Sequence, residues 1–397
     1  MNILYYCDEY PPACNGGIGT VVKLVAEAMS RRGHRVVVAG KYWKGEGRST
    51  IEQINGVTVV RFHKKCYQSL SFVLHGLLRS EQHKQKKAQL IFSKTQRLLE
   101  QLVDRYAIDV IEMPDYVDDF VHSNGLRPLR WKSQVPKIIR VHGSVSFLNY
   151  FLKGRQDEKK VEQDRAYFNQ ADAICAVSDF SREYVKENIC PGKHVDVIYN
   201  PIEESWFKQT DEGRESQTIL FFGKIAKMKG VFSLIKAFNL VAKEYPHVNL
   251  KLIGKGNSKQ AKEFVEPSIA NRVVFSGFMP QERIVEEIDN SLFCILPSYF
   301  ENFSMAALEV LARHKALIYT NRASGNELIE EGVNGLLVNP DDPVQMAVKM
   351  RLLLSNIDLR NRIADNGYEM CRQRFSTAVI IPQIESYYEE LIAKCKQ

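Results

Sequence analysis

Short apolar runs alternate with amphipathic stretches along the chain. In the first half, fully apolar runs rich in β-branched residues occupy residues 2–7, 35–40, 56–62, 109–113, 137–141, 173–177 and 195–199. Strands that are hydrophobic on both faces and alternate with helical segments are typical of a parallel sheet covered by helices on both sides. The pattern therefore predicts an α/β fold with a doubly wound sheet.

The alternation stops once and then begins again. The segment from Gln209 to Gln217 is polar, so it cannot form a core strand, and its composition is that of a linker. Further apolar runs follow at residues 218–223, 249–254, 272–277, 291–297, 316–320 and 335–340. The length of 397 residues also favours two domains. We expect two doubly wound domains, followed by an amphipathic helix from Thr377 to Lys396.

The composition is that of a globular protein. Charged residues make up 25% of the chain, and 54 Lys and Arg against 47 Asp and Glu leave a net charge of +7, which does not imply a nucleic acid partner. The sequence has no apolar run long enough to span a membrane and no basic residue before Lys23, so we expect a cytoplasmic protein. The eight cysteines are scattered without a C-x-x-C pair, which favours reduced thiols and no metal site.

The segment 61–97 is unusually basic. It holds nine Lys or Arg residues and one acidic residue, Glu81, and aromatic residues are interleaved with them. The aromatic residues are Phe62, Tyr67, Phe72 and Phe92. A basic, partly aromatic helical insertion suits an anionic membrane surface or a phosphorylated acceptor. An ordinary solvated helix face is the alternative.

A glycine-rich loop follows the first predicted strand. The sequence PPACNGGIGT, residues 11–20, opens a helix that is expected to run to about Arg32. Glycines allow backbone amides to approach an anion at a helix N-terminus. The spacing of Gly16, Gly17 and Gly19 does not match the dinucleotide fingerprint G-x-G-x-x-G. A tight turn without a ligand is the alternative.

A lysine-rich loop follows the first strand of the second half. Lys224, Lys227 and Lys229 lie within FFGKIAKMKG, residues 221–230. Crowded like charges repel one another unless an anion neutralises them, and a diphosphate could do so. The loop is not a Walker A motif. A solvated lysine loop is the alternative.

A third loop precedes a predicted helix at residues 298–314. Asn302 or Ser304 can cap this helix, whose first-turn N–H groups could then bind a phosphate. Glu301 and Glu309 could accept hydrogen bonds from sugar or ribose hydroxyls. An ordinary surface helix is one alternative. A glycoside hydrolase with the two glutamates as its carboxylate pair is another, but it leaves the glycine and lysine loops unexplained.

Four segments together resemble the retaining nucleotide-sugar glycosyltransferases of glycosyltransferase family 4. They are residues 11–20, 221–230, 298–309 and 332–342, in that order, and E-x7-E after a lysine loop is the most specific match. The resemblance spans nearly the whole chain and implies the GT-B architecture, in which two Rossmann-like domains face each other across a cleft. It implies an acceptor-binding domain at 1–203, a nucleotide-sugar-binding domain at 204–375, and a C-terminal helix at 376–397 that crosses back to the first domain.

The resemblance also assigns the phosphate-binding residues. It implies that Lys224 and Lys229 bind the donor diphosphate and stabilise it as it leaves. Backbone amides of Asn302, Phe303 and Ser304 would bind the same phosphates or the sugar hydroxyls. The family usually has Arg at the position of Lys224 and Gly-Phe-Gly at the positions of Asn302, Phe303 and Ser304. A lysine cannot form the bidentate fork of an arginine.

The remaining site residues are assigned in the same way. The resemblance implies that Glu301 contacts the transferred sugar and that Glu309 holds the ribose hydroxyls. Gly16 and Gly17 match the loop that closes over the diphosphate. His142 matches a histidine that contacts the sugar, although a single histidine after a strand is otherwise more often structural.

The resemblance implies a mechanism and partners as well. The acceptor attacks on the face of the leaving group and a phosphate oxygen takes its proton, so neither a metal nor a cofactor is expected. A UDP-sugar donor is favoured and GDP-mannose is next. The acceptor is a glycan or lipid-linked sugar at the inner face of the cytoplasmic membrane, in surface polysaccharide or lipopolysaccharide synthesis, and residues 112–116 form an acidic, aromatic stretch that could contact it. A nucleotide-sugar epimerase and a non-catalytic glycan-binding or nucleotide-sugar-binding protein remain alternatives.

Overall fold

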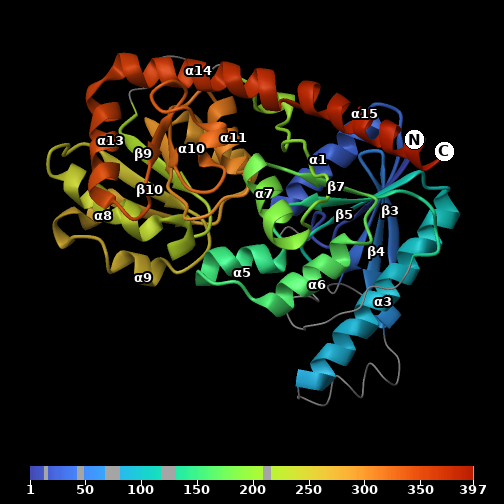
Figure 1. The fold of residues 1–397 in the computed structure, drawn as a ribbon. Coiled ribbons are helices and arrows are strands. Elements are labelled where there is room, and N and C mark those ends of the chain that lie inside the picture. Colours follow the sequence, from blue (N-terminus) through green and yellow to red (C-terminus); the bar gives the residue numbers. More distant parts are fainter. Residues whose placement is uncertain (13–16, 43–48, 68–80, 118–130, 209–215, 397) are drawn as a thin grey trace. The chain divides into compact units, whose positions relative to one another are not determined.

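The computed structural model describes residues 1–12, 17–42, 49–67, 81–117, 131–208 and 216–396. Two compact units can be distinguished by their internal contacts (Figure 1). The first contains Met1–Pro201 together with Ile380–Gln397, and the second contains Ile202–Val379. Most of the predicted linker lies outside the described residues.

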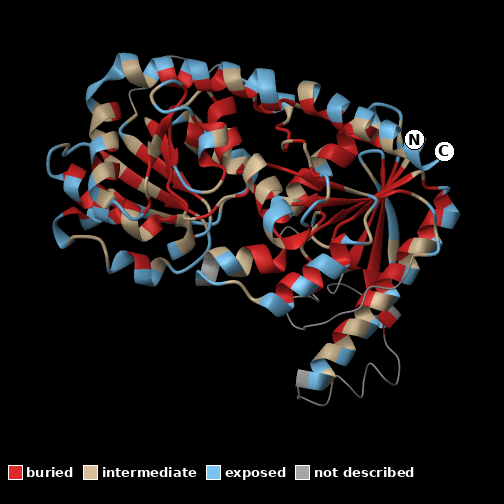
Figure 2. Ribbon diagram, viewed as in Figure 1, coloured by how far each residue is buried: buried red, intermediate tan, exposed pale blue. Residues whose placement is uncertain are grey.

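The described part of the first unit contains an eight-stranded sheet with the order β3-β4-β2-β1-β5-β6-β7-β8. The strands are β1 Asn2–Tyr6, β2 Arg35–Tyr42, β3 Thr50–Ile54, β4 Val57–His63, β5 Val110–Pro114, β6 Lys137–Val141, β7 Ala173–Ala176 and β8 Asp196–Val197. All neighbours are parallel except β3 and β4. Every residue of β4, β5 and β6 is buried, as the doubly apolar runs predict (Figure 2).

Helices pack around this sheet. They are α1 Gly17–Arg31, α3 Glu81–Tyr106, α5 Val145–Lys153, α6 Glu158–Phe168, α7 Asp179–Tyr184 and the later part of α15 Thr377–Cys395, with short helical turns at Lys64–Tyr67 and Val185–Ile189. The apolar face predicted for α15 is buried at Ile380, Ile381, Ile384 and Tyr388. The Tyr388 hydroxyl donates to Glu112 Oε2 at 2.6 Å, which ties the end of this helix to β5.

The second unit contains a parallel six-stranded sheet with the order β11-β10-β9-β12-β13-β14. The strands are β9 Thr218–Phe222, β10 Asn249–Ile253, β11 Val273–Gly277, β12 Phe293–Leu296, β13 Leu317–Thr320 and β14 Leu336–Val338. The α-helices are α8 Val231–Ala242, α9 Ser258–Lys262, α10 Gln281–Asp289, α11 Met305–Ala312, α12 Gly325–Leu328, α13 Pro343–Ser355 and α14 Ile357–Phe375. Turns of 3-10 helix occur at Glu204–Trp206, Lys227–Lys229 and Pro267–Arg272. The doubly wound prediction is confirmed for both halves.

Each sheet has one point at which the strand order reverses. In the first unit it lies between β1 and β5, and in the second between β9 and β12. Loops that leave two such strands at their carboxyl ends diverge to opposite faces of the sheet, and ligands of open α/β sheets bind in the crevice between them. These two switch points are therefore where candidate sites are expected.

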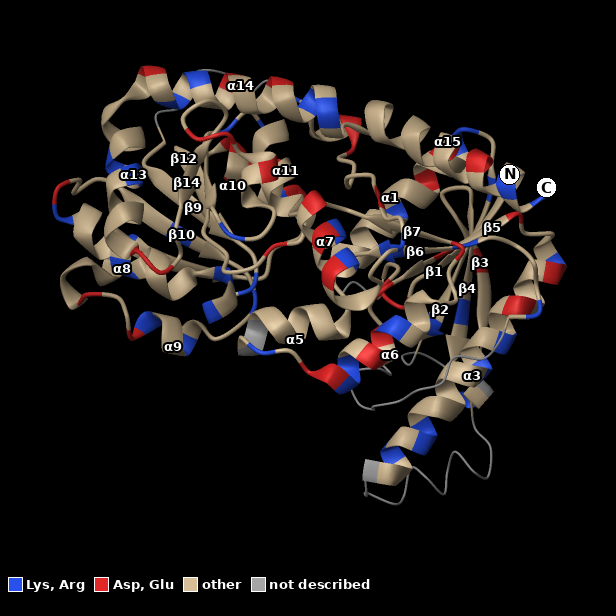
Figure 3. Ribbon diagram, viewed as in Figure 1, with Lys and Arg blue, Asp and Glu red and all other residues tan. Residues whose placement is uncertain are grey.

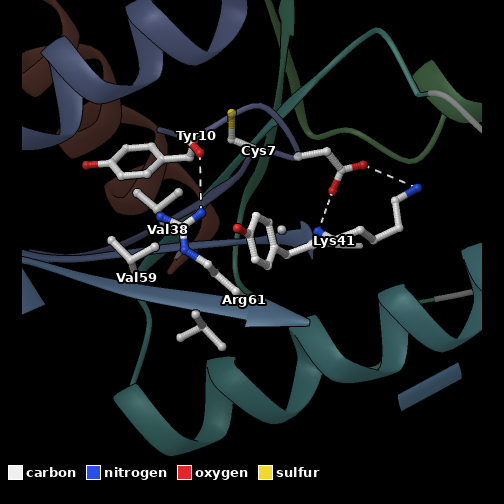
Figure 4. Close-up of a pocket in the computed structure, with 10 residues that line it drawn as sticks. Cys7, Tyr10, Val38, Lys41, Val59 and Arg61 are labelled. Carbon is white, nitrogen blue, oxygen red and sulfur yellow. Dashed lines mark hydrogen bonds and ion pairs between the residues drawn. The ribbon is translucent and has the colours of Figure 1, made fainter. Parts of the chain in front are cut away.

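The structure corrects part of the prediction for residues 61–97. Phe62, Tyr67 and Phe92 are buried, so the interleaved aromatic residues belong to the protein core. Arg61 is buried in β4, where its guanidinium donates to the carbonyl of Tyr10 (Figure 4). It also donates to the carbonyl of Pro11. The prediction treated Arg61 as a surface charge because sequence alone does not show that loop carbonyls satisfy its N–H groups.

The exposed basic residues of this segment lie farther along the chain. Phe72 falls outside the described residues, and the described helix α3 presents Lys84, Lys86, Lys94 and Arg97 to solvent (Figure 3). The basic surface that remains is therefore a helix face, without the aromatic component that the sequence suggested.

Strand β3 was not predicted. Three of its five residues are exposed, and it pairs antiparallel with β4 at the edge of the sheet. An edge strand with one solvated face lacks the continuous apolar run by which the buried strands were recognised.

Candidate functional site

Two loops meet at the switch point of the second unit. The lysine loop, residues 223–230, follows β9, and the glutamate loop, residues 297–304, follows β12. The backbone N–H of Tyr299 donates to the carbonyl of Met228 at 2.8 Å. Because β9 and β12 are neighbours, loops far apart in the sequence are joined at the carboxyl edge of the sheet.

Gly230 allows the lysine loop and the glutamate loop to lie this close together. Its φ of +71° lies in the left-handed region, and a Cβ atom there would lie 1.9 Å from the carbonyl oxygen of Pro297. Any side chain at this position must push the two loops apart.

We therefore expect Gly230→Ala to be more destabilising than a glycine replacement that adds only conformational strain. Gly332 is the matched control, because its φ is +75° and nothing lies within 4 Å of an added Cβ. The extra loss at Gly230 should be about 2 kcal/mol in denaturant unfolding, since overlap with backbone is added to the cost of the left-handed conformation. Equal losses of stability for the two variants would show that the two loops can move apart at no measurable cost.

An ion pair joins the two loops. Lys229 Nζ lies 2.5 Å from Glu301 Oε1, and the Ser298 hydroxyl donates to the same oxygen at 2.7 Å. The Ser324 hydroxyl donates to the backbone carbonyl of Glu301 at 3.0 Å. The side chain of Lys229 is 34% exposed and that of Glu301 is 15% exposed. Two residues selected from the sequence are thus held together, and the Lys229 side chain is partly exposed.

The other lysines of the loop are not neutralised. Lys224 and Lys227 are exposed, and neither forms an ion pair with a described residue. The loop therefore presents positive charge that an anion can compensate.

Helix α11 begins directly after the glutamate loop. Ser304 is its N-cap and accepts a hydrogen bond from the N–H of Ala307 at 3.3 Å, which decides between the two predicted caps. The ring of Phe303 is buried and packs against Phe375 with centroids 5.2 Å apart. A ligand contact of Phe303 would have to come from its backbone. The start of α11 is thereby fixed beside the lysine loop, where its dipole favours an anion.

Glu309 lies in α11 and is partly buried. Among the described residues none forms a hydrogen bond or ion pair with its carboxylate, and burial raises its pKa to about 8. A carboxylate in such surroundings gains from hydroxyl donors, because hydrogen bonds to the charged form offset its desolvation.

Glu309→Gln should increase the stability of the ligand-free protein, increasingly so at higher pH. The folded-state pKa lies above the ordinary value, so between about pH 4.5 and 8 unfolding releases a proton and wild-type stability falls as the pH rises. The glutamine variant lacks this loss, and its advantage in denaturant unfolding should grow from pH 5 to pH 8. A difference that does not change with pH would contradict the assigned shift.

The first unit has a pocket at its own switch point. It is lined by Tyr6, Asp8, Glu9, Ile18, Pro114 and Tyr116. The Asp8 carboxylate accepts a hydrogen bond from the Tyr6 hydroxyl at 2.9 Å. It also accepts one from the Lys41 N–H at 2.7 Å (Figure 4). The stretch 112–116 singled out from the sequence supplies Pro114 and Tyr116. Asp8 and Glu9 were missed, although their position just after the first strand was a usable signal.

The predicted glycine loop is described only in part. Gly16 lies outside the described residues. Gly17 begins α1, is exposed, and has nothing within 4 Å of an added Cβ. Gly19 was noted only for its spacing, but a Cβ there would lie 2.1 Å from the carbonyl oxygen of Glu9. The first turn of α1 is therefore packed against the loop that follows β1.

His142 lies just after β6, in the first unit. Burial, together with the charge of Arg140, lowers its pKa to about 3, so the ring is neutral near pH 7. None of the described residues forms a hydrogen bond with its ring nitrogens. The ring can therefore take part in hydrogen bonds with a ligand without carrying a charge.

The described residues contain neither a metal-ligand cluster nor a helix suited to span a membrane. No group of three or more His, Cys, Asp or Glu side chains there could hold a metal ion. None of the helices in the described ranges is both long enough and apolar enough to cross a membrane.

Two Rossmann-like units, each with loops that follow the strands at its switch point, are the architecture of the GT-B class of glycosyltransferase folds. The sucrose-phosphate synthase of Thermosynechococcus elongatus has a TM-score of 0.79 at 17% identity, with 99% of each chain covered. The structure of Anabaena HepE in complex with UDP and glucose has a TM-score of 0.73 at 18% identity, covering 98% of this chain and 99% of that one. These similarities establish the fold.

The sequence comparisons establish the family. The model of glycosyltransferase family 4 matches residues 15–206, and the model of glycosyl transferases group 1 matches residues 202–370. An uncharacterized glycosyltransferase of Methanocaldococcus jannaschii is 25% identical over 98% of both chains. The chain belongs to glycosyltransferase family 4, as the motifs indicated, and is a glycosyltransferase.

Proposed function

We propose that this protein is a retaining, metal-independent transferase that moves a sugar from a nucleoside diphosphate sugar to a hydroxyl of a glycan or lipid-linked acceptor. One observation carries the proposal. At the switch point of a Rossmann-like sheet, the Lys229–Glu301 pair, the exposed Lys224 and the N-terminus of α11 are gathered on two loops that are bonded to each other. Positive charge and a carboxylate at such a position suit a diphosphate joined to a sugar.

The residues act by electrostatics and orientation. Lys224, Lys229 and the first-turn amides of α11 stabilise the charge that develops on the departing diphosphate. Fixed donors of this kind require no reorganisation during the reaction. Glu301 accepts a hydrogen bond from a hydroxyl of the transferred sugar. The acceptor hydroxyl attacks on the face from which the diphosphate leaves, so retention needs no carboxylate nucleophile. The acceptor proton goes to a phosphate oxygen of the departing diphosphate.

Two further residues orient the donor. Glu309 accepts hydrogen bonds from the ribose hydroxyls, which favour its charged form. His142 contacts the sugar as a neutral ring. The glycine loop with Gly16 and Gly17 closes over the diphosphate and keeps water from the donor.

A UDP-sugar is the proposed donor, and GDP-mannose is the next candidate. The support is that HepE, which shares the fold, has been solved with UDP and glucose. The test is a panel of UDP, GDP and ADP sugars, with products examined by NMR. Transfer with the donor's anomeric configuration retained supports the proposal. An altered donor sugar without any acceptor indicates an epimerase, and binding without turnover indicates a binding protein.

The proposed acceptor is a lipid-linked or polysaccharide hydroxyl at the inner face of the cytoplasmic membrane. The pocket of the first unit combines tyrosines with carboxylates, which suits a polyhydroxyl ligand. The exposed basic residues of α3 suit an anionic lipid surface.

Neutralising Lys84, Lys86 and Lys87 should weaken co-sedimentation with vesicles of anionic lipid. Each lysine near such a surface contributes about 1 kcal/mol, so the triple glutamine variant should bind about 100-fold more weakly. The control replaces three exposed lysines elsewhere, Lys208, Lys259 and Lys396. Binding that depends equally on both sets would reflect net charge alone, and unchanged binding would exclude α3 as the contact.

A further inference from the structure

The turn that carries His142 is held by a buried carboxylate from the neighbouring strand. Asp115 follows β5, is 0% exposed, and crosses to the end of β6. Its Oδ1 accepts the N–H of His142 at 2.8 Å, and its Oδ2 accepts the N–H of Gly143 at 2.9 Å. The backbone N–H groups of His142 and Gly143 are thus both bound by the Asp115 side chain.

A second buried carboxylate holds the other end of the turn. Asp164, from α6, is 1% exposed, and its Oδ2 accepts the N–H of Ser146 in the first turn of α5 at 2.9 Å. The N-cap Ser144 also accepts the N–H of Phe147. The N–H groups of residues 142, 143, 146 and 147 are therefore all bound by side chains.

Burying these two carboxylates lowers the stability of the fold, so a benefit from the geometry they impose is expected. The charge of Asp164 disfavours ionisation of Asp115, and burial disfavours the ionised form of both carboxylates. A neutral acceptor could cap the turn at lower cost. Charged acceptors give shorter and stronger bonds to N–H groups, so what they add is precision in the position of the backbone.

Gly143 completes the turn. Its φ of +128° is accessible to glycine and rarely to other residues, although an added Cβ would have space. The turn therefore has one conformation, set by Asp115 and permitted by Gly143, and this conformation directs the ring of His142. Asp115 also stands between Pro114 and Tyr116, which line the pocket at the β1/β5 switch point.

We propose that Asp115 and Asp164 are positioning residues that fix the His142 turn in the geometry needed for sugar transfer. The inference rests on the proposed function, in which His142 contacts the transferred sugar. A displacement of about 1 Å in such a contact can lower a rate by about 100-fold.

The inference predicts a pH dependence. Burial, with a contribution from the charge of Asp164, raises the pKa of Asp115 to about 7. Tyr167 of α6 is also close to Asp115, and the charges of Asp8 after β1 and Lys41 in β2 act on Tyr167. The ionised carboxylate is the better acceptor, so protonation below about pH 7 loosens the turn and kcat falls as the pH falls.

Asp115→Asn tests the inference. The amide has one acceptor oxygen where the carboxylate uses two, so kcat should fall by about 10- to 100-fold while the donor KM stays within about twofold. The decline of kcat between pH 8 and pH 6 should disappear. The control is Asp172→Asn, because Asp172 accepts the N–H of Lys137 at 2.8 Å at the opposite end of β6. It should change neither kcat nor the profile.

Wild-type kcat and an intact acid limb in Asp115→Asn would overturn the inference. A loss of kcat that only follows the folded fraction, measured by thermal unfolding, would also overturn it. If Asp115→Asn does not fold, Asp164→Asn serves in its place, because it removes the charge from the carboxylate that accepts the N–H of Ser146.

An NMR readout separates this inference from the proposed function. The His142 ring signal of the ligand-free protein, assigned with His142→Gln, should shift in Asp115→Asn and not in Asp172→Asn. A shift without any transferase activity in the wild type would uphold the positioning and refute the function. An unchanged signal, with transferase activity in both the wild type and the variant, would refute the positioning and leave the proposed function intact.

Discussion

Glu301→Gln should lower kcat for sugar transfer by about 100- to 1000-fold while leaving nucleoside diphosphate affinity unchanged or slightly higher. The reason lies in the pair with Lys229, whose Nζ is 2.5 Å from Glu301 Oε1. Glutamine keeps a side chain of the same size for the Ser298 hydroxyl but loses the charge that binds a sugar hydroxyl most strongly in the transition state. It also leaves Lys229 free to bind phosphate.

The matched control is Glu287→Gln. Lys251 Nζ lies 2.6 Å from Glu287 Oε1, and the two side chains are 25% and 16% exposed, close to the values of the candidate pair. This pair lies on β10 and α10, away from the two loops. Both variants remove one charge from a similar ion pair, so a loss of kcat confined to Glu301→Gln is due to position. Equal losses in the two variants would count against a role of Glu301 in the reaction.

The second large effect is expected for the double variant Lys224→Ala, Lys229→Ala. Removing one preorganised donor from a developing charge lowers a rate by about 100- to 1000-fold, and removing two should lower kcat by at least 1000-fold. The effect should exceed that of either single variant, because an exposed Lys224 and a paired Lys229 approach the diphosphate from different points of one loop. Lys251→Ala is the control, and it should retain the wild-type kcat.

The sequence predicted what depends on local pattern. Doubly apolar runs gave the buried strands, and Ser304 was one of two residues named as a cap. The edge strand β3 was missed because its solvated residues do not form an apolar run. Arg61 was taken for a surface charge because a buried arginine satisfied by backbone carbonyls looks the same in sequence as an exposed one.

The geometry of the site could not be predicted in the same way. Lys229 and Glu301 are separated by 72 positions, and they meet only because β9 and β12 are adjacent in the sheet. Hydrophobic periodicity identifies strands but not their order. Asp115 and Asp164 were overlooked as a pair for the same reason, since carboxylates are expected at the surface unless the fold buries them.

The most direct test of the account is a calorimetric titration of UDP, GDP and ADP into the wild type and into the Lys224→Ala, Lys229→Ala variant, without added metal. The account predicts that the wild type binds at least one of the three, and that the folded double variant binds it at least about 100-fold more weakly, since two charges that neutralise the diphosphate are lost. Equal affinity of the two proteins, or no binding by the wild type, would contradict it.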